Sequence, residues 1–104
     1  MAKDQKEWFL QADYDIETAE YMFKGGRYFY SVFMGHLAIE KALKGLYQKR
    51  LRATPPKVHN LVYLLNKIEL RPPELQAKFL IKLNEASVPT RYPETLALLK
   101  KDYS

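Results

Sequence analysis

The sequence contains no cysteine among its 104 residues. This absence excludes disulfides, thiolate metal sites and cysteine nucleophiles, and it fits a reducing cytoplasm. No apolar run approaches the roughly 20 residues that span a bilayer, so no membrane association is expected. The charged amino terminus lacks the apolar stretch of a signal peptide. No segment alternates with period two, so the chain is expected to be one all-α domain over residues 1–104.

Glycine is also scarce, and no glycine-rich phosphate loop is present. Gly25-Gly26 is typical of a helix end, because neither the P-loop lysine nor a preceding strand accompanies it. No cofactor is therefore predicted. Charge points instead to anionic partners: 17 basic residues against 12 acidic ones leave a net charge of +5. Such an excess favours RNA, nucleotides or an acidic protein surface.

Apolar periodicity predicts an antiparallel bundle of four or five helices. The fifth is a short helix over residues 94–101. Pro55-Pro56 and Pro72-Pro73 separate the later helices, and Asn60 is expected to cap the third. The predicted core faces of the first, third and fourth helices are Trp8, Ala12, Ile16, Ala19 and Phe23; Leu61, Leu64, Leu65 and Ile68; and Leu75, Phe79, Leu80 and Leu83.

The second predicted helix, residues 29–47, is apolar around nearly its whole circumference. Such a helix is either central to its domain or shared with a second subunit. We therefore expect a dimer or higher oligomer, since monomers rarely leave large apolar patches exposed. Glu40, Lys41 and Lys44 interrupt this helix. The simplest interpretation is a solvated stripe with one ion pair between Glu40 and Lys44.

Four segments together resemble the HEPN family (higher eukaryotes and prokaryotes nucleotide-binding), in their order and spacing. They are Ala12-x-x-Asp15-Ile16-x-x-Ala19; Tyr28 with Ser31-Val32-Phe33, followed by Ala38-x-Glu40-Lys41-Ala42-Leu43-Lys44; Pro55-Pro56-Lys57-Val58-His59-Asn60-Leu61 with Leu64-Leu65; and Arg91-Tyr92-Pro93-Glu94.

The resemblance implies a cytoplasmic bundle of four or five helices that often pairs as a homodimer. Related domains act as partners of a separately encoded minimal nucleotidyltransferase, in some cases as a toxin–antitoxin pair. Others are metal-independent ribonucleases. Family members usually continue past the Arg-Tyr-Pro loop into a substantial last helix, so that helix is expected to be missing or truncated here.

The resemblance also implies a motif for the ribonucleases of this family, in which four to six residues separate an arginine from a histidine. Arg52 and His59 have that spacing. The histidine would deprotonate a ribose 2′-hydroxyl while the arginine would stabilise the phosphorane charge. Their segment contains a proline pair and precedes the third helix, which is unlike the ribonucleases. Catalysis is thus an alternative, and a binding module for nucleotide or RNA is the leading hypothesis. A purely structural homo-oligomer is the third.

The candidate ligand residues are basic or aromatic. Arg91 is expected to bind a phosphate through two hydrogen bonds, with Lys41 and Lys44 adding positive charge. The alternative is that Arg91 forms an ion pair with a buried acid such as Glu40 or Asp15. His59 either hydrogen-bonds a ligand or fixes a turn through a backbone carbonyl. The predicted anion-binding set is Arg91, Tyr92, Lys41, Lys44 and His59, and Tyr28 and Tyr30 beside Arg27 are the further aromatic candidates.

His36 lies four residues before Glu40, on the same helical face. Two ligands are too few for a metal site, and none further is placed locally. We therefore predict no metal and an ordinary surface or interface pair.

Overall fold

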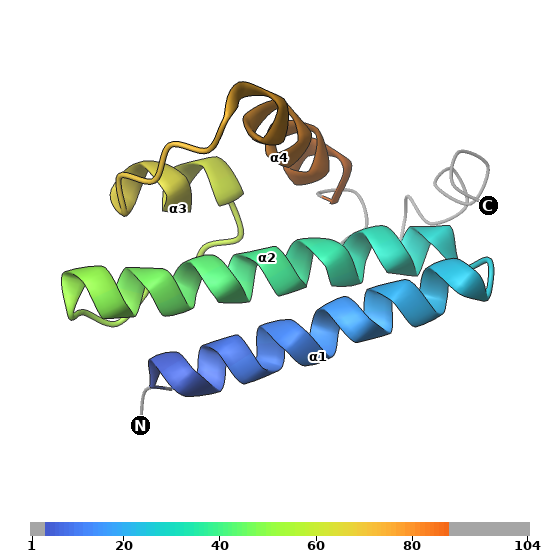
Figure 1. The fold of residues 1–104 in the computed structure, drawn as a ribbon, viewed down its shortest axis with the longest axis horizontal. Coiled ribbons are helices and arrows are strands. Elements are labelled where there is room, and N and C mark those ends of the chain that lie inside the picture. The colour runs from blue at the N-terminus through green and yellow to red at the C-terminus, as the bar shows by residue number, and fades with distance from the viewer. Residues whose placement is uncertain (1–3, 88–104) are drawn as a thin grey trace.

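A computed structural model describes residues 4–87 and consists there of four helices. They are α1 (Gln5–Lys24), α2 (Tyr28–Leu51), α3 (Leu61–Lys67) and α4 (Glu74–Ser87). Figure 1 shows α1 and α2 as a long antiparallel hairpin, with the shorter α3 and α4 on the opposite side of α2. The predicted all-α fold is confirmed. The predicted helix at residues 94–101 lies outside the described residues.

Helix α2 is the centre of the described fold. It packs against each of the other three helices, whereas α1 packs against α2 alone among them. Of the two roles expected for so apolar a helix, a central position is therefore confirmed. Its predicted end at Tyr47 was too early, because the helix continues to Leu51 and stops where Arg52 adopts a left-handed conformation.

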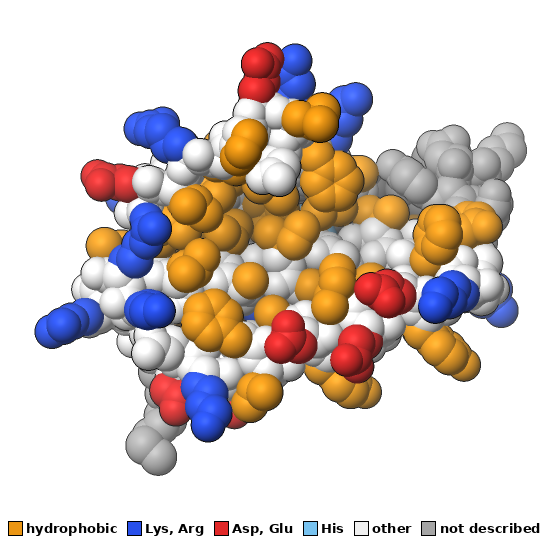
Figure 2. Space-filling model, viewed as in Figure 1, with side chains coloured by type: hydrophobic (Ala, Val, Ile, Leu, Met, Phe, Trp, Pro, Cys, Tyr) orange, Lys and Arg blue, Asp and Glu red, His pale blue; other side chains and the backbone are white. Residues whose placement is uncertain are grey.

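The main apolar core lies between α2 and α3. Leu43 of α2 packs with a buried face formed by Leu61, Leu64 and Leu65 of α3 and by Ile68, which directly follows α3. That face was predicted in full. Figure 2 shows hydrophobic side chains gathered where α3 and α4 lie over α2, with acidic side chains over α1.

Neighbouring helices fasten both ends of the short helix α3. Its first amide, of Leu61, donates to Asn84 Oδ1 of α4 at 2.9 Å. Asn60 caps the same end as predicted, since its Oδ1 accepts from the Tyr63 amide at 3.1 Å. At the other end, Arg50 Nη1 of α2 donates to the Ile68 carbonyl at 2.7 Å. A helix of two turns is marginal alone, so these bonds and its leucines hold it in place.

The α1–α2 interface differs from the predicted one. The buried residues of α1 are Ala12, Asp15 and Ala19, whereas Ile16 is 41% exposed and Phe23 is 60% exposed. The prediction of Ile16 and Phe23 as core residues was therefore wrong. Asp15 takes the inward position because it meets a lysine of α2, which rotates the buried face by one residue.

A similar correction applies to α4. Leu80 and Leu83 pack against the core as predicted, but Leu75 is 82% exposed and Phe79 is 60% exposed. The inward face of α4 also carries Asn84, which bonds to α3. Only one strip of this helix can face α2 and α3, and the other apolar strip is left outside.

Candidate functional site

A ladder of polar side chains runs along one side of α2 at intervals of four residues. It consists of His36, Glu40, Lys44 and Gln48, which the helical repeat brings into one strip. His36 is 1% exposed, Glu40 4% and Lys44 7%. The solvated stripe expected for Glu40 and Lys44 was therefore wrong, as was a surface position for His36. Removing such groups from water is costly unless each has a partner.

The Glu40 carboxylate is the hub of this ladder. Lys44 Nζ lies 3.1 Å from its Oε2, and His36 Nδ1 lies 3.6 Å from its Oε1. His59, in the loop before α3, brings Nδ1 within 3.0 Å of Oε1 and 3.2 Å of Oε2. One buried carboxylate thus joins α2 to the start of α3 (the arrangement of these elements is seen in Figure 1).

The contact with Glu40 sets the direction in which His59 can act. An ionised carboxylate only accepts hydrogen bonds, so Nδ1 carries the proton and donates it. The other ring nitrogen, Nε2, is then left for a further partner, and the His59 side chain is 59% exposed. Neutral Nε2 can accept from a ribose hydroxyl, and protonated Nε2 can donate to a phosphate oxygen. Neither prediction for His59 included this carboxylate, although the sequence placed both residues in matched segments.

A second polar layer connects the ladder to α1. Lys44 Nζ stands 5.8 Å from the centre of the Trp8 ring, and Trp8 Nε1 donates to Gln48 Oε1 at 3.0 Å. Lys41 Nζ lies 2.7 Å from Asp15 Oδ2. This contact is ionic rather than a well-angled hydrogen bond, since no hydrogen bond to that buried oxygen is found within residues 4–87. Sequence periodicity alone did not reveal these cross-helix pairs.

The two predicted ligand lysines therefore have internal carboxylate partners. Asp15 holds Lys41 and Glu40 holds Lys44, so an external anion would have to compete with an acid for each. Their role in ligand binding stays a prediction. Arg91 and Tyr92 lie outside the described residues. Both the phosphate contact and the ion pair with Glu40 or Asp15 that were considered for Arg91 therefore stay predictions.

The ribonuclease pair Arg52 and His59 is not brought together. His59 contacts Glu40, whereas Arg52 ends α2, about 18 Å farther along the helix at 1.5 Å per residue. No group of three His, Asp or Glu side chains able to hold a metal ion occurs in the described part of the chain. The structure thus supports His59 as an oriented ligand-binding side chain more directly than it supports Arg52 and His59 as a catalytic pair.

The two tyrosines proposed as base contacts are surface residues with aromatic neighbours. The Tyr28 ring lies 5.2 Å from the Phe23 ring, and the Tyr30 ring lies 4.7 Å from the Phe29 ring, centre to centre. Both tyrosines are exposed, so a ligand could reach them. Their role stays a prediction.

These features define an all-helical domain built on a long hairpin, with buried charge at its centre and an oriented histidine at the start of α3. The HEPN domain model matches residues 5–103. The chain belongs to the HEPN family. No curated protein and no solved structure matched it. None of the helices over residues 4–87 is both long enough and apolar enough to cross a membrane.

Proposed function

We propose that this chain is a HEPN binding module that recognises a nucleotide or RNA and works in the cytoplasm with a separately encoded minimal nucleotidyltransferase. The observation that carries the ligand proposal is His59. Its Nδ1 is held by a buried carboxylate while its side chain is 59% exposed, and the chain has a net charge of +5. A ring held in one orientation loses less entropy when a ligand binds.

Two substitutions of His59 separate ligand binding from folding. Asparagine can place its amide near the position of Nδ1 and keep the bond to Glu40, but it has nothing at the position of Nε2. Glutamine reaches the position of Nε2 but loses the Nδ1 contact. We expect His59→Asn to keep the melting temperature within a few degrees while RNA affinity falls roughly tenfold, the usual loss of one hydrogen bond to a charged group.

The measurement is fluorescence anisotropy with a single-stranded RNA and with mononucleotides. Equal affinity of His59→Asn and the wild type would remove His59 from the site. A wild type that binds neither ligand at low salt would overturn the proposed function. Incubation of the RNA with the protein in EDTA tests the ribonuclease alternative, and cleavage that disappears in both His59 variants would favour it.

The partner proposal is tested by expression with the flanking reading frames. Co-purification of a small nucleotidyltransferase supports it, and a protein that purifies alone under these conditions counts against it. We further propose a homodimer or higher oligomer, because apolar side chains such as Leu75 and Phe79 stand exposed on α4. A monomer mass by light scattering at micromolar concentration would contradict this proposal.

A further inference from the structure

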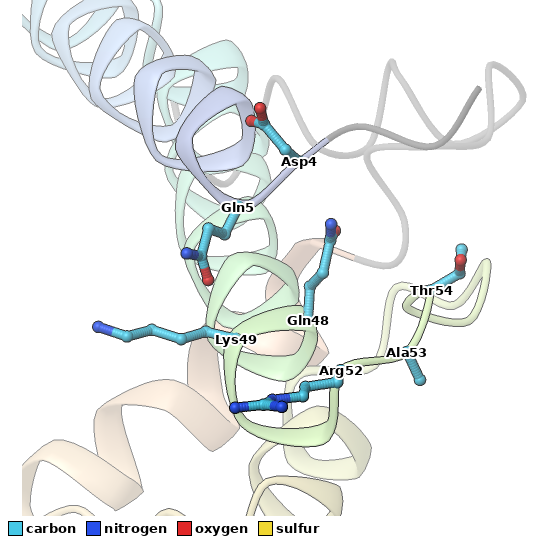
Figure 3. A pocket seen from close by; sticks show the side chains of 7 residues that line it. All are labelled: Asp4, Gln5, Gln48, Lys49, Arg52, Ala53 and Thr54. Atoms are coloured by element: carbon cyan, nitrogen blue, oxygen red, sulfur yellow. The ribbon is translucent and has the colours of Figure 1, made fainter.

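The open end of the α1–α2 hairpin contains a second polar feature, which adjoins the last member of the polar ladder, Gln48. A hollow of about 670 Å³ lies between the start of α1, the last turn of α2 and the segment that follows (Figure 3). We call it the hairpin-end hollow. Its lining residues are Asp4, Gln5, Gln48, Lys49, Arg52, Ala53 and Thr54.

The cations of this hollow differ from those beside Glu40. Lys49 and Arg52 make no ion pair or side-chain hydrogen bond with the described residues, in contrast to the acid-bound Lys41 and Lys44. Lys49 lies in the last turn of α2 and Arg52 directly follows that turn as the cap of the helix, so both line the hollow. Figure 3 shows both side chains extending from the last turn in the same direction. The hollow therefore holds two positive charges that are available to an anion.

Gln48 adds a donor whose orientation the structure determines. The indole N–H of Trp8 can only donate, so the Gln48 oxygen must face it, at 3.0 Å. The Gln48 amide nitrogen is thereby left as a donor on a residue that lines the hollow. Gln5 and Thr54 supply further polar groups at its edge.

Asp4 is the one acid among the described lining residues. Its Oδ1 accepts from the Glu7 amide at 2.8 Å and so caps α1. Its carboxylate has a structural role there, yet its charge must weaken the attraction of an anion. Among the described residues that line the hollow, none is an aromatic residue on which a base could stack.

We propose that the hairpin-end hollow binds the phosphodiester backbone of a single-stranded nucleic acid, through Lys49, Arg52 and the Gln48 amide. This inference rests on the nucleic-acid function proposed above and adds a contact that is independent of base identity. Two cations without an acidic partner among residues 4–87 suit neighbouring phosphates of a strand. The described lining offers no ring on which a base could stack, which disfavours recognition through the base.

The conformation of Arg52 allows a test that misfolding cannot imitate. Arg52 ends α2 with φ 51° and ψ 41°, the left-handed region in which glycine is preferred. Arg52→Gly removes the guanidinium and also relieves the backbone, so we expect the melting temperature to rise by roughly 4–8 °C. A loss of RNA affinity in this variant then reports the missing side chain.

The experiment measures the affinity of a twelve-nucleotide oligouridylate, and of an oligoadenylate of the same length, at several salt concentrations. Arg52→Gly and Lys49→Gln should each lower affinity about fivefold for both sequences. Each should also reduce the slope of log K against log salt by about 0.7. Asp4→Ser keeps a capping hydroxyl and removes the charge, so it should tighten binding about threefold.

Lys24→Ala is the matched control, because it removes the same charge at the far end of α1, about 28 Å from Gln5. If Arg52→Gly and Lys49→Gln bind as tightly as Lys24→Ala, the hollow is not a nucleic-acid site, although the function proposed through His59 stands. A mononucleotide that displaces the oligouridylate at equal phosphate concentration would overturn the strand proposal. A wild type that binds no RNA overturns both.

Discussion

The two sides of α2 are packed in different ways. Toward α3 and α4 the contacts are leucine and isoleucine side chains, five of which form a buried apolar cluster. Toward α1 the buried residues are alanines and an aspartate, with a glycine of α2 close to an aromatic ring. We call these the leucine side and the hairpin side. The first side buries large apolar side chains, and the second combines small buried residues with paired charges.

This difference determines how each side should respond to substitution. On the leucine side, stability depends on burying apolar area and should fall with any polar group placed there. On the hairpin side, it depends on small residues and on partners for each buried charge. Four substitutions test the contrast, from the largest expected effect to the smallest.

Leu43→Asp should have the largest effect, because it places a carboxylate without a partner in the leucine cluster. The expected loss exceeds about 5 kcal/mol, which is comparable to the whole stability of a small domain. Circular dichroism should show an unfolded chain or a broken oligomer. Lys49→Ala is the control, since it changes an exposed residue and should alter stability by at most about 0.5 kcal/mol. Matching melting curves for the two variants would contradict the structure of α2.

Glu40→Leu tests the buried charges where the two sides of α2 meet. It leaves the Lys44 ammonium buried and removes the bond to His59, so we expect a loss of about 3–5 kcal/mol. The double variant Glu40→Leu/Lys44→Met replaces the ion pair by apolar groups and should recover a large part of that loss. Urea denaturation measures both. A double variant no more stable than Glu40→Leu alone would show that Lys44 is not the residue left without its partner.

The α3 part of the leucine side was predictable from sequence, whereas the polar pairs of the hairpin side were not. Leu61, Leu64 and Leu65 repeat with helical spacing, and their burial needs no information from elsewhere in the chain. The hairpin interface depends on pairs that are far apart in sequence, such as Asp15 with Lys41 and Trp8 with Gln48. A hydrophobicity pattern favours Ile16 over Asp15 for the core, because it does not show that Lys41 of α2 lies opposite Asp15 and pairs with it.

The candidate site was predicted only in its components. His59 and Glu40 both lie in segments that match the family pattern, yet their hydrogen bond joins a loop to a helix and follows from the tertiary fold. The spacing of His36, Glu40, Lys44 and Gln48 at every fourth position was a signal that could have indicated a buried polar strip. Arg52 was singled out for its spacing to His59, whereas the structure places it in the hairpin-end hollow.

Gly45→Ala tests the close approach on the hairpin side. A Cβ at Gly45 would lie 2.7 Å from Phe9 Cε1, so the ring or the helix must move. Alanine improves helix propensity by about 1 kcal/mol, but overpacking costs about 1–3 kcal/mol, so we expect a net loss of about 1 kcal/mol. Gly35 lies in the same helix, and a Cβ there meets no described atom within 4 Å. Gly35→Ala should therefore raise stability by up to about 1 kcal/mol. The same sign for both variants in thermal denaturation would refute the close contact.

Leu75→Ser should have the smallest effect on stability, although its spacing in α4 is that of a core residue. Its side chain is 82% exposed, so little apolar area is lost and the change should stay within about 0.5 kcal/mol. Leu80→Ser is the matched control, because Leu80 packs against the core in the same helix and should lose several times more. Chemical denaturation of both variants, together with their masses by light scattering, separates two explanations for an exposed apolar side chain on α4. An unchanged mass and unchanged stability for Leu75→Ser would mean that this strip of α4 covers nothing. A reduced mass with intact monomer folding would mean that the outer strip of α4 contacts a second copy of the chain. The apolar packing around α3 and α4 would then continue across a subunit interface.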